Sequence, residues 1–345
     1  MRACGAKMTT GRGAAIFGCA GATLGRDEAA FFRDYDPFGF IVFARNIETP
    51  DQLRRLTAAL RDCVGRDAPI LVDQEGGRVQ RLRAPHWREW TAPLDFIAAA
   101  GDHAERALYL RYQIIAHELA SVGIDANCAP VADLITQTTH PFLKNRCYGA
   151  DPERVSLLAR AVAQGLLDGG CLPVVKHMPG HGRSTVDTHH DLPRVDAARQ
   201  ELIAHDFAPF KALNDLPMAM TAHLVFTAYD DLPATQSAVM IDVIRSQIGF
   251  GGLLMSDDLN MQALSADISA RTFAAMAAGC DIALQCNGDL DEMQQVAKAA
   301  GDMHTAARQR AQAALAWRKP AAQVDIAALE ADLAGLMKDA PHGPD

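Results

Sequence analysis

Eight short apolar runs, each followed by a segment with helical patterning, constrain the fold of this chain more than any other feature. The runs occupy residues 14–18, 39–44, 69–73, 125–131, 172–177, 218–223, 251–257 and 281–286. Nearly continuous hydrophobicity in such short segments is typical of parallel strands that are buried on both faces. Eight strand–helix units predict an α/β fold, the (β/α)8 TIM barrel. A doubly wound sheet is the competing architecture, because the runs alone do not show closure.

The segments between the runs carry signals for helix ends. Residues 49–52 (TPDQ) offer an N-cap threonine followed by a proline at the first helical position, and Asp151-Pro152 offers a similar start. Gly169-Gly170 is expected to end the second of these helices. The chain has 345 residues, 49% of them hydrophobic, and we expect a single domain over 1–345. Its barrel would span about 14–320, with a C-terminal helix and tail over about 321–345.

Charge and cysteine content limit the partners and the compartment. The formal net charge is −9 and no block of basic residues occurs, which argues against nucleic acid and anionic membranes as partners. No uncharged apolar run reaches the ~20 residues that a membrane span needs, and we interpret the Gly-rich apolar stretch near the start as a strand, not a signal peptide. The eight cysteines are scattered without a CxxC pair, as buried reduced thiols would be. We therefore expect a cytoplasmic protein, with a monomer favoured.

Polar side chains follow the apolar runs at the points where the predicted strands end. In a barrel these ends meet on one face, where catalysis takes place. The residues concerned are Asp73, Glu75, Arg78, Arg81, Asp133, Arg146, Lys176, His177, Asp187, His189, His223, Asp257 and Asp258. Their repeated position at strand ends predicts an active site better than any single residue does.

Each of these residues also has a purely structural interpretation. Asp73 could cap a helix, and Arg146 could be a solvated loop residue. Lys176 directly follows a buried run, and because lysine is rarely buried without a partner, Lys176 and His177 are better placed in a pocket. A carboxylate at the depth of Asp257 costs free energy unless it is hydrogen-bonded or used. The aspartate that follows it is the better candidate for a helix cap.

Four histidines lie on the segment 176–193 (KHMPGHGRSTVDTHHDLP): His177, His181, His189 and His190. A zinc site is therefore the first hypothesis to weigh. The segment is rich in Gly and Pro and lacks a helical HExxH pattern, so we predict no metal site. Asp187 lies two residues before His189, so its carboxylate can hold one ring nitrogen and leave the other for proton transfer.

Four long motifs, in order over roughly residues 14–288, carry a resemblance to a known family. They are LVDQEGGRVQRLR, NRCYG, KHMPGHG with the downstream DTHHDLP, and GLLMSDDLNM. With these motifs the chain resembles glycoside hydrolase family 3, and specifically the single-domain bacterial β-N-acetylhexosaminidases of peptidoglycan recycling. Two departures are small: the family usually has Ser at Thr188 and Phe at Met178. Neither change removes a functional group.

The resemblance implies a role for each candidate residue. Asp257 would be the nucleophile, and His189 the acid/base with Asp187 as its partner. The residues implied to hold the sugar are Asp73, Arg81, Arg146, Lys176 and His177. The implied reaction is retaining exo-cleavage that frees N-acetylglucosamine from 1,6-anhydro-N-acetylmuramoyl peptides, without metal or organic cofactor. The substrate would be a small muropeptide, and the process would be cell-wall recycling.

Two other reactions remain as alternatives. A β-N-acetylglucosaminide phosphorylase could use the same fold, because a neutral or cationic histidine repels incoming phosphate less than a glutamate would. A barrel aldolase could use Lys176 as a Schiff-base amine. Phosphate-dependent turnover would identify the first, and borohydride trapping with a carbonyl substrate would identify the second.

Overall fold

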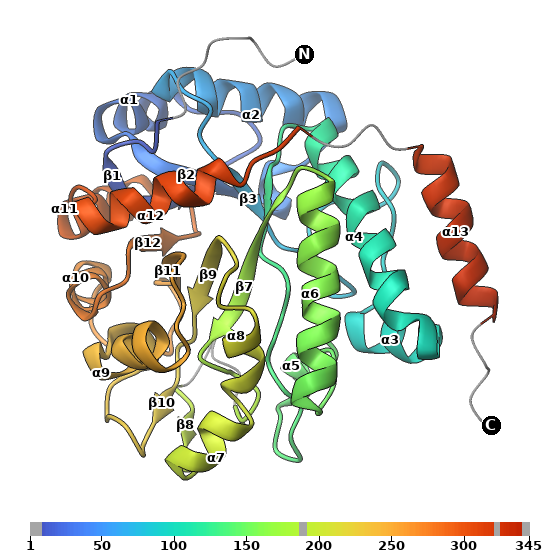
Figure 1. Cartoon of the computed structure of the whole chain (residues 1–345). Helices are drawn as coiled ribbons and strands as arrows, with labels where there is room; N and C mark the ends of the chain where they lie inside the picture. Colours follow the sequence, from blue (N-terminus) through green and yellow to red (C-terminus); the bar gives the residue numbers. More distant parts are fainter. Residues whose placement is uncertain (1–8, 186–191, 321–324, 340–345) are drawn as a thin grey trace.

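The fold is built around a closed barrel of eight parallel strands, seen in the computed structural model, which describes residues 9–185, 192–320 and 325–339 (Figure 1). Around the barrel the strand order is β1-β12-β11-β9-β7-β6-β3-β2. The barrel strands are β1 (Gly13–Gly18), β2 (Pro37–Val42), β3 (Ile70–Val72), β6 (Ala126–Asn127), β7 (Leu172–Met178), β9 (Met218–Thr221), β11 (Leu253–Asp258) and β12 (Ile282–Gln285). Each predicted run overlaps one strand. The TIM barrel is therefore confirmed and the doubly wound sheet is excluded.

Closure is visible in the pairing of the first and last barrel strands. Ile16 of β1 lies opposite Leu284 of β12 in a parallel register, and the other edge of β1 pairs with β2. Two small sheets lie outside the barrel: β4 (Gln74–Gly76) pairs with β5 (Val79–Gln80), and β8 (Arg194–Val195) pairs with β10 (Val225–Phe226).

Helices surround the barrel on its outer face (Figure 1). They are α1 (Arg26–Tyr35), α2 (Pro50–Val64), α3 (Pro93–Ala100), α4 (Ala104–Ser121), α5 (Pro141–Lys144), α6 (Pro152–Asp168), α7 (Arg199–Ala204), α8 (Ala208–Ala212), α9 (Ala238–Asp242), α10 (Ile268–Ala278), α11 (Leu290–Ala300), α12 (Thr305–Ala316) and α13 (Ile326–Asp339). Short 3-10 turns occupy Ala44–Asn46, Gly101–His103 and Ala234–Gln236, and a π-helical turn occupies Val243–Gln247.

The predicted helix ends are found at the expected residues. The Thr49 side chain accepts a hydrogen bond from the backbone N–H of Gln52 (3.2 Å), which caps α2. Asp151 caps α6 in the same way through the N–H of Arg154 (2.7 Å), and α6 ends before Gly169. These caps are local, so the sequence pattern predicts them without knowledge of the tertiary fold.

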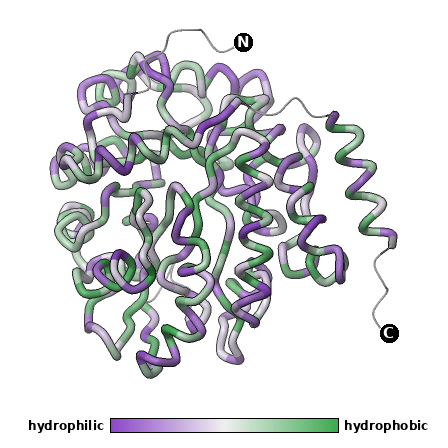
Figure 2. The backbone as a smooth tube through the Cα atoms, viewed as in Figure 1, coloured by the Kyte–Doolittle hydropathy of each residue, from purple (hydrophilic) through white to green (hydrophobic). Residues whose placement is uncertain are grey.

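The core has two parts, because side chains along each strand alternate between the barrel interior and the helix layer. Ile16 and Leu284 point into the inner cluster, while Phe17 and Val42 join the larger cluster between strands and helices. Along the helices, hydrophobic and hydrophilic positions alternate in Figure 2 as expected for one buried face. Fully burying a side chain such as Phe17 stabilises the fold by ~1.5–3 kcal/mol.

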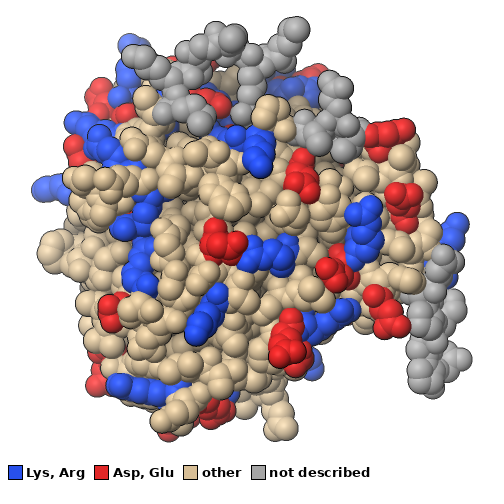
Figure 3. Space-filling view, viewed as in Figure 1, with Lys and Arg blue, Asp and Glu red and all other residues tan. Residues whose placement is uncertain are grey.

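The surface carries charges of both signs. On the face drawn in Figure 3, Lys and Arg side chains are interspersed with Asp and Glu. The C-terminal helix α13 packs against α3 and α4, and Glu330 on it pairs with Arg88. Among the described residues, no helix is long and apolar enough to cross a membrane.

Candidate active site

A cavity of about 410 Å³ lies at the C-terminal ends of the barrel strands. Its wall includes six residues that the sequence predicts for the site: Asp73, Arg81, Arg146, Lys176, His177 and Asp257. They come from β7, from β11 and from the segments that follow β3 and β6. The strand ends thus bring together residues that are up to 184 positions apart in the sequence, from Asp73 to Asp257. Asp187 and His189 lie outside the described residues.

Lys176 is the centre of a buried charge cluster. Its ammonium Nζ lies 2.9 Å from Oδ1 of Asp73 and 2.6 Å from Oε1 of Glu75, and the side chain is only 2% exposed. Burial would lower the pKa of Lys176, but the two carboxylates outweigh burial and hold it above the ordinary lysine value. The amine is therefore a cation and a hydrogen-bond donor, not a free nucleophile.

Two arginines complete this cluster. Arg146 forms a bidentate pair with Glu75, at 2.9 Å from Nε to Oε2 and 2.8 Å from its terminal nitrogen to Oε1. Arg81 donates to the second oxygen of Asp73 at 3.0 Å. Burial would raise the pKa of Asp73, yet the charges of Lys176 and Arg81 hold it below the ordinary carboxyl value. Fixed donors and fixed acceptors therefore lie side by side, an arrangement that suits the paired hydroxyls of a sugar.

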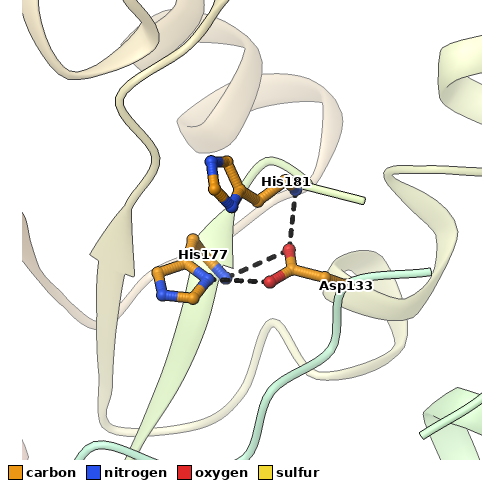
Figure 4. A group of neighbouring side chains, drawn as sticks. All are labelled: Asp133, His177 and His181. Carbon is orange, nitrogen blue, oxygen red and sulfur yellow. Dashed lines mark hydrogen bonds and ion pairs between the residues drawn. The ribbon is translucent and has the colours of Figure 1, made fainter. Parts of the chain in front are cut away.

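A second group of buried side chains surrounds Asp133 (Figure 4). One carboxylate oxygen, Oδ2, lies 2.7 Å from Nδ1 of His177, and the other accepts the backbone N–H of His181 at 2.7 Å. Burial would raise the pKa of Asp133, but His177 outweighs it and lowers the pKa. With Nδ1 held by Asp133, Nε2 of His177 is 3.5 Å from Arg146. Asp133 thus orients the His177 ring beside the charge cluster.

Asp133, His177 and His181 also form the one group among the described residues whose ligand atoms lie close enough together to hold a metal ion. This compact trio differs from the sequence-based view that the histidines lack a ligand pattern. Each oxygen of Asp133 accepts a hydrogen bond from the protein and keeps a further lone pair, so the trio is a candidate ligand set that the prediction of no metal site did not include. One ring nitrogen of His181 lies within 4.8 Å of an oxygen of this carboxylate but makes no hydrogen bond to it (Figure 4).

Asp257 is the penultimate residue of β11, and it lines the cavity. Its Oδ1 accepts the backbone N–H of Asp258 at 2.8 Å, and no other hydrogen bond to this carboxylate is present within the described part of the chain. Burial would raise its pKa, but nearby His223 and His177 outweigh burial and keep it below the ordinary value. Asp257 is therefore an ionised carboxylate, and its Oδ2 has no hydrogen-bond partner among the residues that the structure describes.

The neighbouring Asp258 has a different environment. Its Oδ1 accepts the backbone N–H groups of Asn260 and Cys286, both at 3.1 Å, and burial raises its pKa to about 6. Its backbone carbonyl lies 3.0 Å from Nε2 of His223, whose other ring nitrogen contacts Thr235. The expectation that this second aspartate caps the next helix is wrong, because Asp267 caps α10. Asp258 holds the following turn, but it also lines the cavity.

Glu75 and Asp133 were among the polar residues predicted at the strand ends, but neither was assigned a role, although both hold residues that were. One available signal was Lys176 itself, since a lysine that directly follows a buried run needs a carboxylate partner. The DQEGG segment offered two candidates, Asp73 and Glu75, and Lys176 pairs with both. No comparable local signal linked Asp133 to His177, because 43 residues separate them.

These features define a class of protein: a barrel enzyme whose site presents an ionised carboxylate beside fixed donors and acceptors for hydroxyl groups. The glycosyl hydrolase family 3 N-terminal domain matches residues 20–315. The chain therefore belongs to glycosyl hydrolase family 3, and it is a glycoside hydrolase.

Relatives support this assignment. The β-hexosaminidase of Alkalilimnicola ehrlichii is 38% identical over 283 residues, 80% of this chain and 81% of that protein. The NagZ structure from Neisseria gonorrhoeae in complex with N-trifluoroacetyl-D-glucosamine superposes with a TM-score of 0.82 at 31% identity, covering 95% of this chain and 99% of that one. A NagZ structure from N. gonorrhoeae in complex with a zinc ion gives 0.80 at 30% identity, covering 96% and 97%.

The charge cluster makes a prediction about stability. We expect Lys176→Met to lower the free energy of unfolding by ~3–5 kcal/mol at neutral pH, because two buried carboxylates lose their shared cation. Lys176 depresses the pKa of Asp73 and Glu75, so its contribution is complete above their unfolded values of ~4 and is lost as the pH falls. Urea unfolding at pH 7 and at pH 4 should therefore show a smaller deficit at pH 4.

The matched control is Lys211→Met, at an exposed lysine of α8. It should change stability little at either pH. A deficit of equal size at pH 7 and pH 4 for Lys176→Met would contradict the electrostatic explanation and leave only lost packing.

Proposed function

We propose that this enzyme is a retaining exo-β-N-acetylglucosaminidase that frees N-acetylglucosamine from 1,6-anhydro-N-acetylmuramoyl peptides during cell-wall recycling in the cytoplasm. The observation that carries the proposal concerns Asp257, an ionised carboxylate that accepts one hydrogen bond among the described residues. It lines the same cavity as the charge cluster of Asp73, Lys176 and Arg81. The name of the Alkalilimnicola relative and the N-acylated glucosamine bound by the Neisseria protein agree with it.

In the proposed first step, a carboxylate oxygen of Asp257 attacks the anomeric carbon as the glycosidic bond breaks. His189, oriented by Asp187, gives its proton to the leaving oxygen, so the aglycone departs as a neutral alcohol. The product of this step is a covalent glycosyl-enzyme. In the second step His189 takes a proton from water, which attacks the same carbon and frees Asp257. The two displacements together retain the anomeric configuration.

Asp73, Arg81, Arg146, Lys176 and His177 are proposed to hold the sugar in this scheme. Asp73 would accept from hydroxyl groups, while Lys176 and Arg81 would donate to the same hydroxyls. Asp133 keeps Nδ1 of His177 engaged, which leaves Nε2 for the ligand. Because these groups are fixed by the protein before the substrate arrives, little free energy is spent on orienting them.

The raised pKa of Lys176 weakens the aldolase alternative, because a Schiff base forms only from a neutral amine. Identifying the reaction products distinguishes a phosphorylase from a hydrolase. A chromogenic β-N-acetylglucosaminide and the matching β-glucoside should be assayed with and without phosphate. The proposal expects hydrolysis of the N-acetylglucosaminide in the absence of phosphate, with free sugar as product. Strict dependence on phosphate, with sugar 1-phosphate as product, would replace hydrolysis by phosphorolysis.

Metal removal provides a separate test. We expect prolonged treatment with a strong chelator to leave the rate unchanged, because the proposed chemistry has no step that needs a Lewis acid. Because a structure of the Neisseria relative contains a zinc ion, the enzyme should be assayed both after treatment with the chelator and after addition of zinc. Loss of activity that returns with added zinc would overturn the proposed mechanism and make Asp133, His177 and His181 candidate ligands.

A further inference from the structure

We propose that His181 is a specificity residue that hydrogen-bonds the 2-acetamido group of the substrate. This inference rests on the proposed function and extends it to a residue that has no role in the mechanism above. His181 lies on the turn after β7, four residues beyond His177, and its side chain lines the cavity.

The first observation is that the imidazole of His181 is buried without a hydrogen-bond partner in the part of the chain that the structure describes. The residue is only 8% exposed, and neither Nδ1 nor Nε2 has a hydrogen-bond partner among the described residues. Leaving a buried donor and acceptor unsatisfied destabilises the folded protein, so native structures seldom retain such groups without a reason. A bound ligand that supplies both partners is such a reason, and the position of His181 on the cavity wall puts a ligand within reach.

The second observation is that the backbone of His181 is held in place. Its N–H donates to Asp133 at 2.7 Å, and its carbonyl accepts the N–H of Ser184 at 3.0 Å. The next residue, Gly182, packs so closely that a Cβ atom there would lie 1.8 Å from the carbonyl oxygen of Leu134. The backbone therefore fixes the position of the imidazole beside the His177 ring, and the centroids of the two rings are 5.3 Å apart.

The third observation is the charge state. Burial, reinforced by the nearby His177, lowers the pKa of His181 to about 3, so the ring is neutral at physiological pH. A neutral imidazole offers one N–H donor and one nitrogen acceptor. A secondary amide offers the complementary pair, a C=O acceptor and an N–H donor. Carboxylates only accept hydrogen bonds, and ammonium and guanidinium groups only donate them. No single charged side chain of the cavity can therefore bind both the C=O and the N–H of an amide.

The test compares two substrates that differ at carbon 2. We expect His181→Phe to lower kcat/KM for a chromogenic β-N-acetylglucosaminide by ~10²-fold, because two hydrogen bonds to the acetamido group are lost. Hydrolysis of the matching β-glucoside should be nearly unchanged, which reduces the preference for the N-acetylated sugar. His181→Gln retains a donor and an acceptor and should recover part of the preference. The control His205→Phe replaces a half-buried histidine that does not line the cavity.

Thermal unfolding of the ligand-free variants separates a specificity role from a structural role. If His181 had a structural role, replacing it would lower the melting temperature. Because the His181 ring has no hydrogen-bond partner within the described part of the chain, His181→Phe should keep or raise the melting temperature while it loses specificity. An equal fall for both glycosides, or no fall for either, would overturn the inference while leaving the proposed function standing. A wild-type enzyme that fails to hydrolyse the N-acetylglucosaminide would instead contradict the proposed function, and this inference with it.

Discussion

Replacing Asp257 with alanine should reduce kcat for β-N-acetylglucosaminides by at least ~10³-fold while the protein stays folded. The loss is large because no other carboxylate in the described cavity is free to attack: Asp73 is paired with Lys176 and Arg81, and Asp258 holds two backbone N–H groups. The fold should survive because, among the described residues, Asp257 accepts a single hydrogen bond, from the N–H of the next residue. Initial rates and a thermal melt of the same preparation measure both expectations.

The isosteric variant Asp257→Asn is the matched control. It keeps the shape and an acceptor for the Asp258 N–H but removes the nucleophilic charge, so it should be as inactive as Asp257→Ala. Substantial activity in either variant would show that another group attacks the sugar. An inactive Asp257→Ala that has also lost its melting transition would locate the effect in the fold and refute the claim that Asp257 is dispensable for structure.

Replacing His189 with alanine should have an effect that depends on the leaving group. A sugar alcohol has a high pKa and needs a proton as it departs, whereas dinitrophenolate leaves almost unaided. We expect His189→Ala to slow the natural disaccharide by ~10²–10⁴-fold and a dinitrophenyl glycoside far less. Asp187→Ala should show the same pattern more weakly, because it orients the imidazole and does not transfer the proton.

Variants of the sugar-holding residues separate this effect from simple loss of binding. Arg81→Met should mainly raise KM, with a similar factor for both leaving groups. If His189→Ala slows both substrates equally, or neither of them, His189 is not the acid/base. Glu75 is then a poor replacement, since both of its oxygens are engaged by Arg146 and Lys176, so Asp258 becomes the next carboxylate to test.

The barrel was predictable because its signal is local and repeated. Runs such as residues 172–175 (LPVV) are apolar at every position, as expected for a strand buried on both faces, and caps such as Thr49 depend on the adjacent three residues. The hairpin of β4 and β5 carried no such signal. It forms where Gln74 holds the N–H groups of Arg81 and Leu82 through its side chain, at 2.9 and 3.0 Å, a contact that sequence periodicity does not encode.

The location of the site was predictable from the sequence, but the hydrogen bonds and ion pairs between its side chains were less so. Strand ends placed Asp73, Lys176 and Asp257 on one cavity, as expected for a barrel. The pairing of Lys176 with Glu75 joins residues about 100 positions apart, and the clamp of Asp133 on His177 depends on how β7 lies beside the segment after β6. The unpartnered ring of His181 is a property of packing alone. Such features depend on the tertiary structure and cannot be predicted from residue type and spacing.

The central claim, a covalent intermediate on Asp257, is tested most directly by trapping it. A 5-fluoro-N-acetylglucosaminyl fluoride reacts through its good leaving group, while the ring fluorine destabilises the oxocarbenium-like transition state and slows breakdown of the glycosyl-enzyme. Intact-protein mass spectrometry followed by peptide mapping should find one added sugar, attached to Asp257. Turnover without any adduct, or an adduct on Asp258 or another carboxylate, would contradict the account.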